Sequence, residues 1–105
     1  MIGDSRTASF EALEANRSSV AGVLSFSTVS LLLETGTKAI DTGRAEIIDL
    51  SGVSESDSSG LALLVEWLSV ARSAKRKLRY ENIPQQLRQL ARLSDVEELL
   101  DAKHA

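Results

Sequence analysis

Residues 47–68 read IIDLSGVSESDSSGLALLVEWL, and this stretch decides the fold. It opens with a compact, β-branched-rich apolar run, which is typical of a buried central strand, here over residues 45–51. It closes with an apolar pattern of helical length, which predicts a long helix over residues 58–74. The polar residues between these two elements, 52–60, are predicted to form a loop.

The flanking sequence predicts further strands and helices in a regular order. The expected elements are a hairpin of residues 7–13 and 18–26, a helix over 27–42 with Ser27 or Thr28 as N-cap and Gly43 at its end, a strand over 78–83, a helix over 85–93 after Pro84, and a short helical or extended element at 96–100. Two strands joined by a long helix pair in parallel, with a right-handed crossover. The predicted fold class is α/β, a mixed β-sheet with its helices packed mainly on one face.

The composition indicates one domain and excludes several classes of function. The chain has 105 residues and a net charge of −3, and we expect a single domain with its core at about residues 18–100. It has no cysteine, so thiolate chemistry is excluded. It has one histidine, His104, which leaves almost nothing from which to build a Ser–His catalytic site or a multi-histidine metal site. Asp49 and Asp57 make too thin an acidic cluster for a magnesium site. We therefore expect no enzymatic activity, no metal and no cofactor.

Charge and hydropathy also restrict the partners. No apolar run approaches the roughly 18–20 residues of a membrane-spanning helix, and the first residues lack the pattern of a signal peptide. We expect a cytoplasmic protein without direct membrane insertion. Five cations lie between Arg72 and Arg79, where they offset the negative end of the preceding helix dipole; binding of phosphate or lipid head groups is the alternative. No aromatic residues interleave with them as nucleic-acid binding would require, so we expect no nucleic-acid partner.

The residues with the strongest functional signal are Asp57, Ser58, Ser59 and Gly60, which we call the DSSG segment. Asp and Ser before an apolar helical pattern are N-cap residues, because their oxygens accept the free amide hydrogens of the first turn. The simpler interpretation is a well-capped helix. The functional interpretation is a docking or regulatory site, because a phosphate on Ser58 or Ser59 would bring about two negative charges to a helix start.

The helix that follows the DSSG segment is apolar over an arc of roughly 220°, which is wider than one buried stripe requires. Leu63 and Trp67 belong to a second apolar side, beside the side that packs on the sheet. Either a neighbouring helix covers this second side, or part of it is an interface with Trp67 as its central residue, since Trp is enriched in binding hot spots.

The sequence resembles STAS domains, the family of sulfate transporters and anti-sigma factor antagonists. The residues that carry the resemblance are Ile48–Val53 and Asp57–Leu64, which match the family's pattern of strand, loop, Asp-Ser-Ser-Gly and helix. Within the family it looks most like the MlaB-type subunits of phospholipid ABC transporters in Gram-negative bacteria, on residues 22–29, 64–68, 80–84 and 90–94. Two positions depart from the family pattern: Ser56 replaces an apolar residue, and Lys75 replaces a helix-ending glycine.

The resemblance implies a non-enzymatic adaptor that binds the ATPase subunit (MlaF-like) of an ABC transporter, within a complex that includes a membrane permease. It places the protein at the inner membrane through that complex, in phospholipid trafficking that maintains outer-membrane lipid asymmetry. Under this resemblance the DSSG segment becomes the partner contact. Leu63 and Trp67 join it as candidate partner-binding residues on the apolar pattern of the adjacent helix alone. The resemblance also implies an alternative, an anti-sigma factor antagonist switched by phosphorylation of Ser58.

Overall fold

The structure is a computed structural model and describes residues 7–101, so His104 lies outside the described residues. The elements, in chain order, are strands β1 (Ala8–Ala12) and β2 (Arg17–Leu24), helix α1 (Phe26–Asp41), strand β3 (Ile47–Ser56), helix α2 (Ser58–Ser73), strand β4 (Arg79–Glu81), and helices α3 (Gln85–Leu93) and α4 (Glu97–Asp101). The four strands form one sheet in the order β1-β2-β3-β4. The pair β1–β2 is antiparallel, whereas β2–β3 and β3–β4 are parallel, so the predicted mixed sheet is confirmed.

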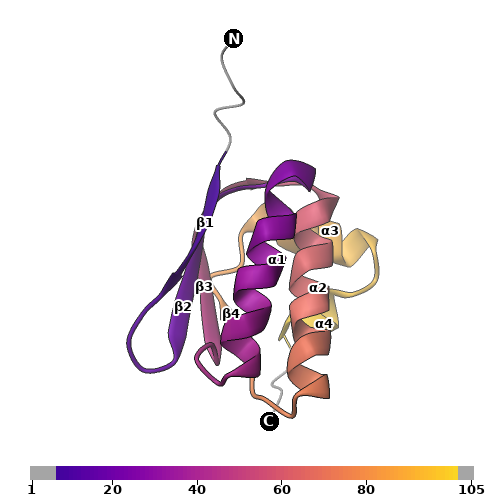
Figure 1. Cartoon of the computed structure of the whole chain (residues 1–105). Helices are drawn as coiled ribbons and strands as arrows, with labels where there is room; N and C mark the ends of the chain where they lie inside the picture. Colours follow the sequence, from indigo (N-terminus) through magenta and orange to yellow (C-terminus); the bar gives the residue numbers. More distant parts are fainter. Residues whose placement is uncertain (1–6, 102–105) are drawn as a thin grey trace.

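The helices lie on one side of the sheet. Figure 1 shows α1 and α2 side by side against the sheet, with both N-termini at the same end of the molecule. The central strand β3 places alternate side chains on the two faces, with Ile48 and Leu50 buried beneath the helices. Glu81 of β4 forms ion pairs with Arg17 of β2 and with Arg79 of its own strand. The predicted fold class, with helices mainly on one face, is therefore confirmed.

The predicted loop over residues 52–60 is wrong in its first half. Strand β3 continues to Ser56 because residues 52–56 keep pairing with β2, with Gly52 opposite Ala21 and Ser56 opposite Leu24. Polar residues are compatible with this strand because its exposed positions are solvated, and only Val53 and Ser56 of the five are buried. The connection to α2 is reduced to Asp57.

Helix α1 begins earlier than predicted. Its N-cap is Ser25, rather than Ser27 or Thr28. Thr28 lies in the first turn, where its Oγ1 accepts a hydrogen bond from the Ser25 N–H at 2.9 Å and donates one to the Val23 carbonyl at 2.9 Å. The error arises because a hydroxyl three positions into a helix can reach back to the cap, so the cap and its partner look alike in sequence.

Three helices end in the same way, each with a left-handed residue after the C-cap. These residues are Gly43 after α1, Lys75 after α2 and Asp95 after α3, with φ values of 79°, 58° and 61°. The N–H groups of Lys75 and of the following residue donate to carbonyls of the last turn of α2, which is the Schellman arrangement. Lys75 thus adopts the conformation that a glycine would adopt at least steric cost.

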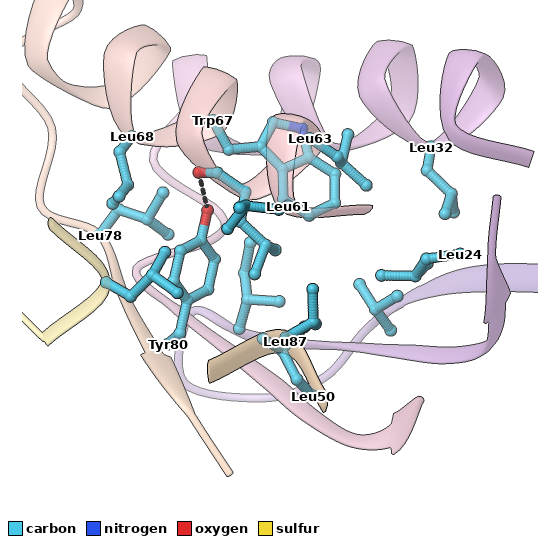
Figure 2. Close-up of a cluster of buried hydrophobic side chains, with 14 of the residues drawn as sticks. Leu24, Leu32, Leu50, Leu61, Leu63, Trp67, Leu68, Leu78, Tyr80 and Leu87 are labelled. Carbon is cyan, nitrogen blue, oxygen red and sulfur yellow. Dashed lines mark hydrogen bonds between the residues drawn. The ribbon is translucent and has the colours of Figure 1, made fainter. Parts of the chain in front are cut away.

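A buried hydrogen bond joins β4, an edge strand of the sheet, to the middle of α2. Tyr80 of β4 is buried, and its hydroxyl donates to the Leu64 carbonyl at 2.6 Å (Figure 2). Burial raises the pKa of the Tyr80 phenol well above its ordinary value. This bond positions α2, and with it the DSSG segment, relative to the sheet.

Candidate partner-docking site

The DSSG segment and Ser56, the residue before it, are bonded to two neighbouring elements, β2 and α3. The Asp57 N–H donates to the Leu24 carbonyl at the end of β2, at 3.0 Å. The Ser56 N–H donates to the side chain of Gln86 in α3, at 3.0 Å. Asp57 has an extended backbone, and its Oδ1 accepts the Ser59 N–H at 2.8 Å, so the predicted N-cap role of this aspartate is confirmed.

Ser56 and Gly60 lie against each other below this segment. The buried Ser56 hydroxyl donates to the Asp57 carbonyl at 3.0 Å, which satisfies the polar residue that stands where the family places an apolar one. A Cβ at position 60 would lie 2.0 Å from Ser56 Oγ and 2.9 Å from Leu24 Cβ. Glycine is therefore required at position 60 so that the first turn of α2 can approach the ends of β2 and β3.

The four residues of the segment differ in exposure. Asp57 and Ser58 are exposed, Ser59 is half-buried and Gly60 is buried. The surface offered by the segment consists of the Asp57 and Ser58 side chains and one side of Ser59. The amide groups of the first turn and the positive end of the helix dipole lie at the same point, which favours an acceptor or an anion there.

An apolar groove begins at Ser59 and runs between α1 and α2. We call it the α1–α2 groove; its volume is about 340 Å³, and it is lined by Val29, Ser30, Leu33, Ser59, Ala62, Leu63 and Glu66. Phe26, at the same end of α1, is 83% exposed. Sequence reasoning identified Leu63 and missed the other apolar lining residues, because Val29, Leu33 and Ala62 belong to two helices whose relative placement the sequence does not reveal.

The side chain of Trp67 is buried, which corrects its predicted role as the centre of an interface. It is fully covered, 0% exposed, and its ring packs edge-to-face on Phe10 with 5.8 Å between ring centroids. Its Nε1–H is directed at the Leu33 carbonyl, at 3.4 Å. Gly36 of α1 provides the space for the ring. Helix α1 therefore covers the second apolar side of α2 at Trp67, which is the other alternative that the sequence left open. Leu63 is also largely buried, at 4% exposed, but it lines the α1–α2 groove.

The other sequence candidates lie away from the DSSG segment. Asp49 is eight residues before Asp57 along an extended strand, about 25 Å away, so the two carboxylates do not form a pair. The Asp49 carboxylate instead accepts hydrogen bonds from Asn82 and from the Ser51 N–H, which lower its pKa. The cations of residues 72–79 begin in the last turn of α2, with Arg72, and continue beyond it, at the end opposite the DSSG segment.

Two classes of site receive no support from the described residues. Within residues 7–101, no group of three or more His, Cys, Asp and Glu side chains could hold a metal ion. In the same part of the chain, none of the helices combines the length and the apolar character needed to span a bilayer.

Comparison with known proteins gives one family and one fold. Residues 11–101 match the family described as "Mlab, STAS domain". Among solved structures, the anti-sigma factor antagonist SpoIIAA in its unphosphorylated form is similar, with a TM-score of 0.67 and 18% identity over 87% of this chain and 83% of that chain. The Bacillus cell fate determinant SpoIIAA in the phosphorylated form has a TM-score of 0.65 and 18% identity, over 87% and 86% of the two chains. No curated protein sequence matches significantly.

These solved structures share the fold, and their low identity supports nothing finer. The family match shows more than the fold, namely the family itself, because it spans all of β2 to α4 and includes the DSSG segment. The chain therefore belongs to the MlaB-like family of STAS domains.

Proposed function

We propose that this chain is a non-enzymatic adaptor subunit that binds the ATPase subunit of an ABC transporter for phospholipids. The observation that carries the proposal is the DSSG segment of an MlaB-like domain, exposed at Asp57 and Ser58 and continuous through Ser59 with an apolar groove. An adaptor needs a rigid scaffold and an accessible patch, and it needs no cluster of catalytic groups. In this proposal the partner contacts Asp57, Ser58 and Ser59 at the surface and Leu63 through the groove, while the buried Gly60 lets the first turn of α2 approach the sheet.

In this proposal the protein is cytoplasmic and lies at the inner membrane through the ATPase and a membrane permease. The transporter moves phospholipids, and this transport maintains the lipid asymmetry of the outer membrane. The adaptor supports assembly and activity of the ATPase and requires no cofactor of its own.

The test is co-purification with the ATPase subunit of a phospholipid ABC transporter from the same organism. We expect the two proteins to co-elute and the Ser58→Arg variant to lose the complex, because a long cation would occupy the exposed surface of the DSSG segment. Thr35→Arg is the matched control, since Thr35 is an exposed hydroxyl residue on α1 outside the groove. Failure of the wild-type chain to co-elute, or an intact complex with Ser58→Arg, would contradict the proposal.

A second candidate function is an anti-sigma factor antagonist that is switched by phosphorylation of Ser58. Ser58 is exposed and is the first residue of α2, where the helix dipole favours a phosphate. Incubation with a cognate anti-sigma kinase and ATP tests this function by intact-mass spectrometry. Addition of one phosphate that Ser58→Ala abolishes supports it, and an unchanged mass removes it.

A further inference from the structure

The α1–α2 groove carries a charge as well as an apolar floor. Val29, Leu33 and Ala62 contribute apolar surface, and Glu66 lies on its lining. Glu66 is exposed, and its carboxylate makes no salt bridge within residues 7–101. No lysine or arginine belongs to the lining, so an incoming cation would meet an uncompensated negative charge.

A second groove continues along the same pair of helices. It has a volume of about 300 Å³, shares Glu66 with the first groove, and is lined also by Asp41, Ser69, Val70, Ser73 and Ala74. Together the two grooves follow α2 from Ser59 to Ala74, about 22 Å at the rise of an α-helix. This length equals about four helical turns. Its lining is apolar and hydroxyl-bearing, and its charges are carboxylates only.

We propose that the seam formed by these two grooves receives a basic amphipathic helix of the partner protein. Apolar side chains of that helix enter the α1–α2 groove beside Leu63, and a lysine or arginine pairs with Glu66. Helices pack by placing their side-chain ridges into such grooves, and an amphipathic helix supplies the apolar side chains at the required spacing. The inference rests on the proposed function, which supplies the partner, and it specifies that partner's chemistry.

Charge complementarity favours this occupant over a second copy of the chain. The basic helix of this protein is α3, which presents Arg88, Arg92 and the 85% exposed Leu93. Arg88 already pairs with Asp101, and Arg92 already pairs with Glu97. To place α3 on the seam, a second copy would have to break these ion pairs before Arg88 or Arg92 could reach Glu66, whereas a separate basic helix brings cations without that loss.

The test uses a synthetic amphipathic peptide of leucine and lysine, about 14 residues long to fit the seam, and its leucine–glutamate counterpart. Titrated into the isotope-labelled chain, the lysine peptide is expected to shift the amide resonances of Ser30, Leu33 and Ala62 to saturation. Glu66→Gln should weaken binding about two- to fivefold, as expected for an exposed ion pair, and Glu66→Lys about tenfold or more. Glu98→Lys is the matched control, because it makes the same charge change on exposed α4.

Three outcomes overturn the inference. They are equal binding of the glutamate peptide, resonance shifts confined to other elements, and concentration-dependent shifts of the seam residues without peptide, which would identify a second copy as the occupant. The failure of the proposed function looks different. A wild-type chain that does not co-elute with the ATPase overturns that function, whereas equal co-elution of Glu66→Lys and Glu98→Lys overturns only the inference.

Discussion

Gly36 of α1 and Trp67 of α2 lie in direct contact, so that a Cβ at position 36 would be 2.3 Å from Trp67 Cζ2. Real Cβ atoms do not approach other atoms so closely, and the large ring is held between α1 and Phe10. The two helices can therefore adopt their observed separation only with glycine at this position. The walls of the α1–α2 groove depend on that separation.

Gly36→Ala is expected to destabilise the protein, because the added methyl group overpacks the interface at a cost of about 1–3 kcal/mol. The gain of about 1 kcal/mol that alanine brings to a helix interior offsets part of this cost, so the expected net loss is up to about 2 kcal/mol. Urea unfolding measures the free energy of unfolding. Thr35→Ala, at the adjacent exposed position, is the control and should change it little. A variant as stable as the wild type would show that α1 moves away without cost.

Ser18→Ala is expected to stabilise the protein by about 1 kcal/mol, because a buried hydroxyl without a partner is costly. Ser18 is 0% exposed, and its Oγ has no hydrogen-bond partner among the described residues. Thermal unfolding should show a higher midpoint for Ser18→Ala than for the wild type and for Ser19→Ala, the half-buried neighbour. A lower midpoint for Ser18→Ala would indicate that the hydroxyl does find a partner.

The sequence predicts the fold well where local patterns are strong. The apolar run of β3, the capping aspartate of α2 and the parallel pairing of β3 with β4 all follow from residue order and periodicity. The end of β3 was missed because polar residues on an exposed strand resemble a loop. Its pairing with residues 21–24 is a non-local contact that no window of sequence contains.

The candidate site was predictable in part. Asp57 and Ser58 are exposed, as a docking surface requires, because they lie where the inner strand β3 ends and helix α2 begins. The role proposed for Trp67 failed because its burial depends on Gly36, thirty-one positions away. Periodicity shows that α2 has two apolar sides, but only packing shows that α1 covers one of them.

Lys75→Gly is expected to stabilise the protein by roughly 0.5–1 kcal/mol, because Lys75 has a φ of 58° and glycine adopts this region without a steric penalty. Chemical denaturation should show a higher midpoint. Lys77→Gly serves as the comparison, since Lys77 is equally exposed and has no positive φ. An equal response of the two variants would mean that the helix end does not determine the effect.

Gly60→Ala is expected to destabilise the protein and to displace the DSSG segment, since the new Cβ would meet Ser56 Oγ at 2.0 Å. Ser56→Ala removes that oxygen, so the double variant should recover part of the lost stability. Recovery should remain incomplete, because Leu24 Cβ would still lie 2.9 Å away. A double-mutant cycle on the free energy of unfolding measures this coupling. Strictly additive effects of the two substitutions on the free energy of unfolding would show that the new Cβ does not clash with Ser56 Oγ.

Asp49 is expected to contribute to acid sensitivity. Hydrogen bonds from Asn82 and from the Ser51 N–H lower its pKa in the folded state below the ordinary value of an aspartate. A carboxyl with a lowered folded pKa stabilises the fold above its unfolded pKa, and this stability is lost as pH falls through the folded pKa. Asp49→Asn should therefore lose less stability than the wild type between about pH 5 and pH 2. Parallel pH dependences of the two proteins would exclude the contribution.

The two amide hydrogen bonds of Ser56 and Asp57, to α3 and to β2, leave little freedom in the chain beside Ser58. A chemical group added to that hydroxyl would thus leave the backbone course unchanged and would alter the local electric potential. The domain would then present the same shape in two charge states. Discrimination between the two states would rest with whichever protein touches the site, and its response would follow the ionic strength of the solution.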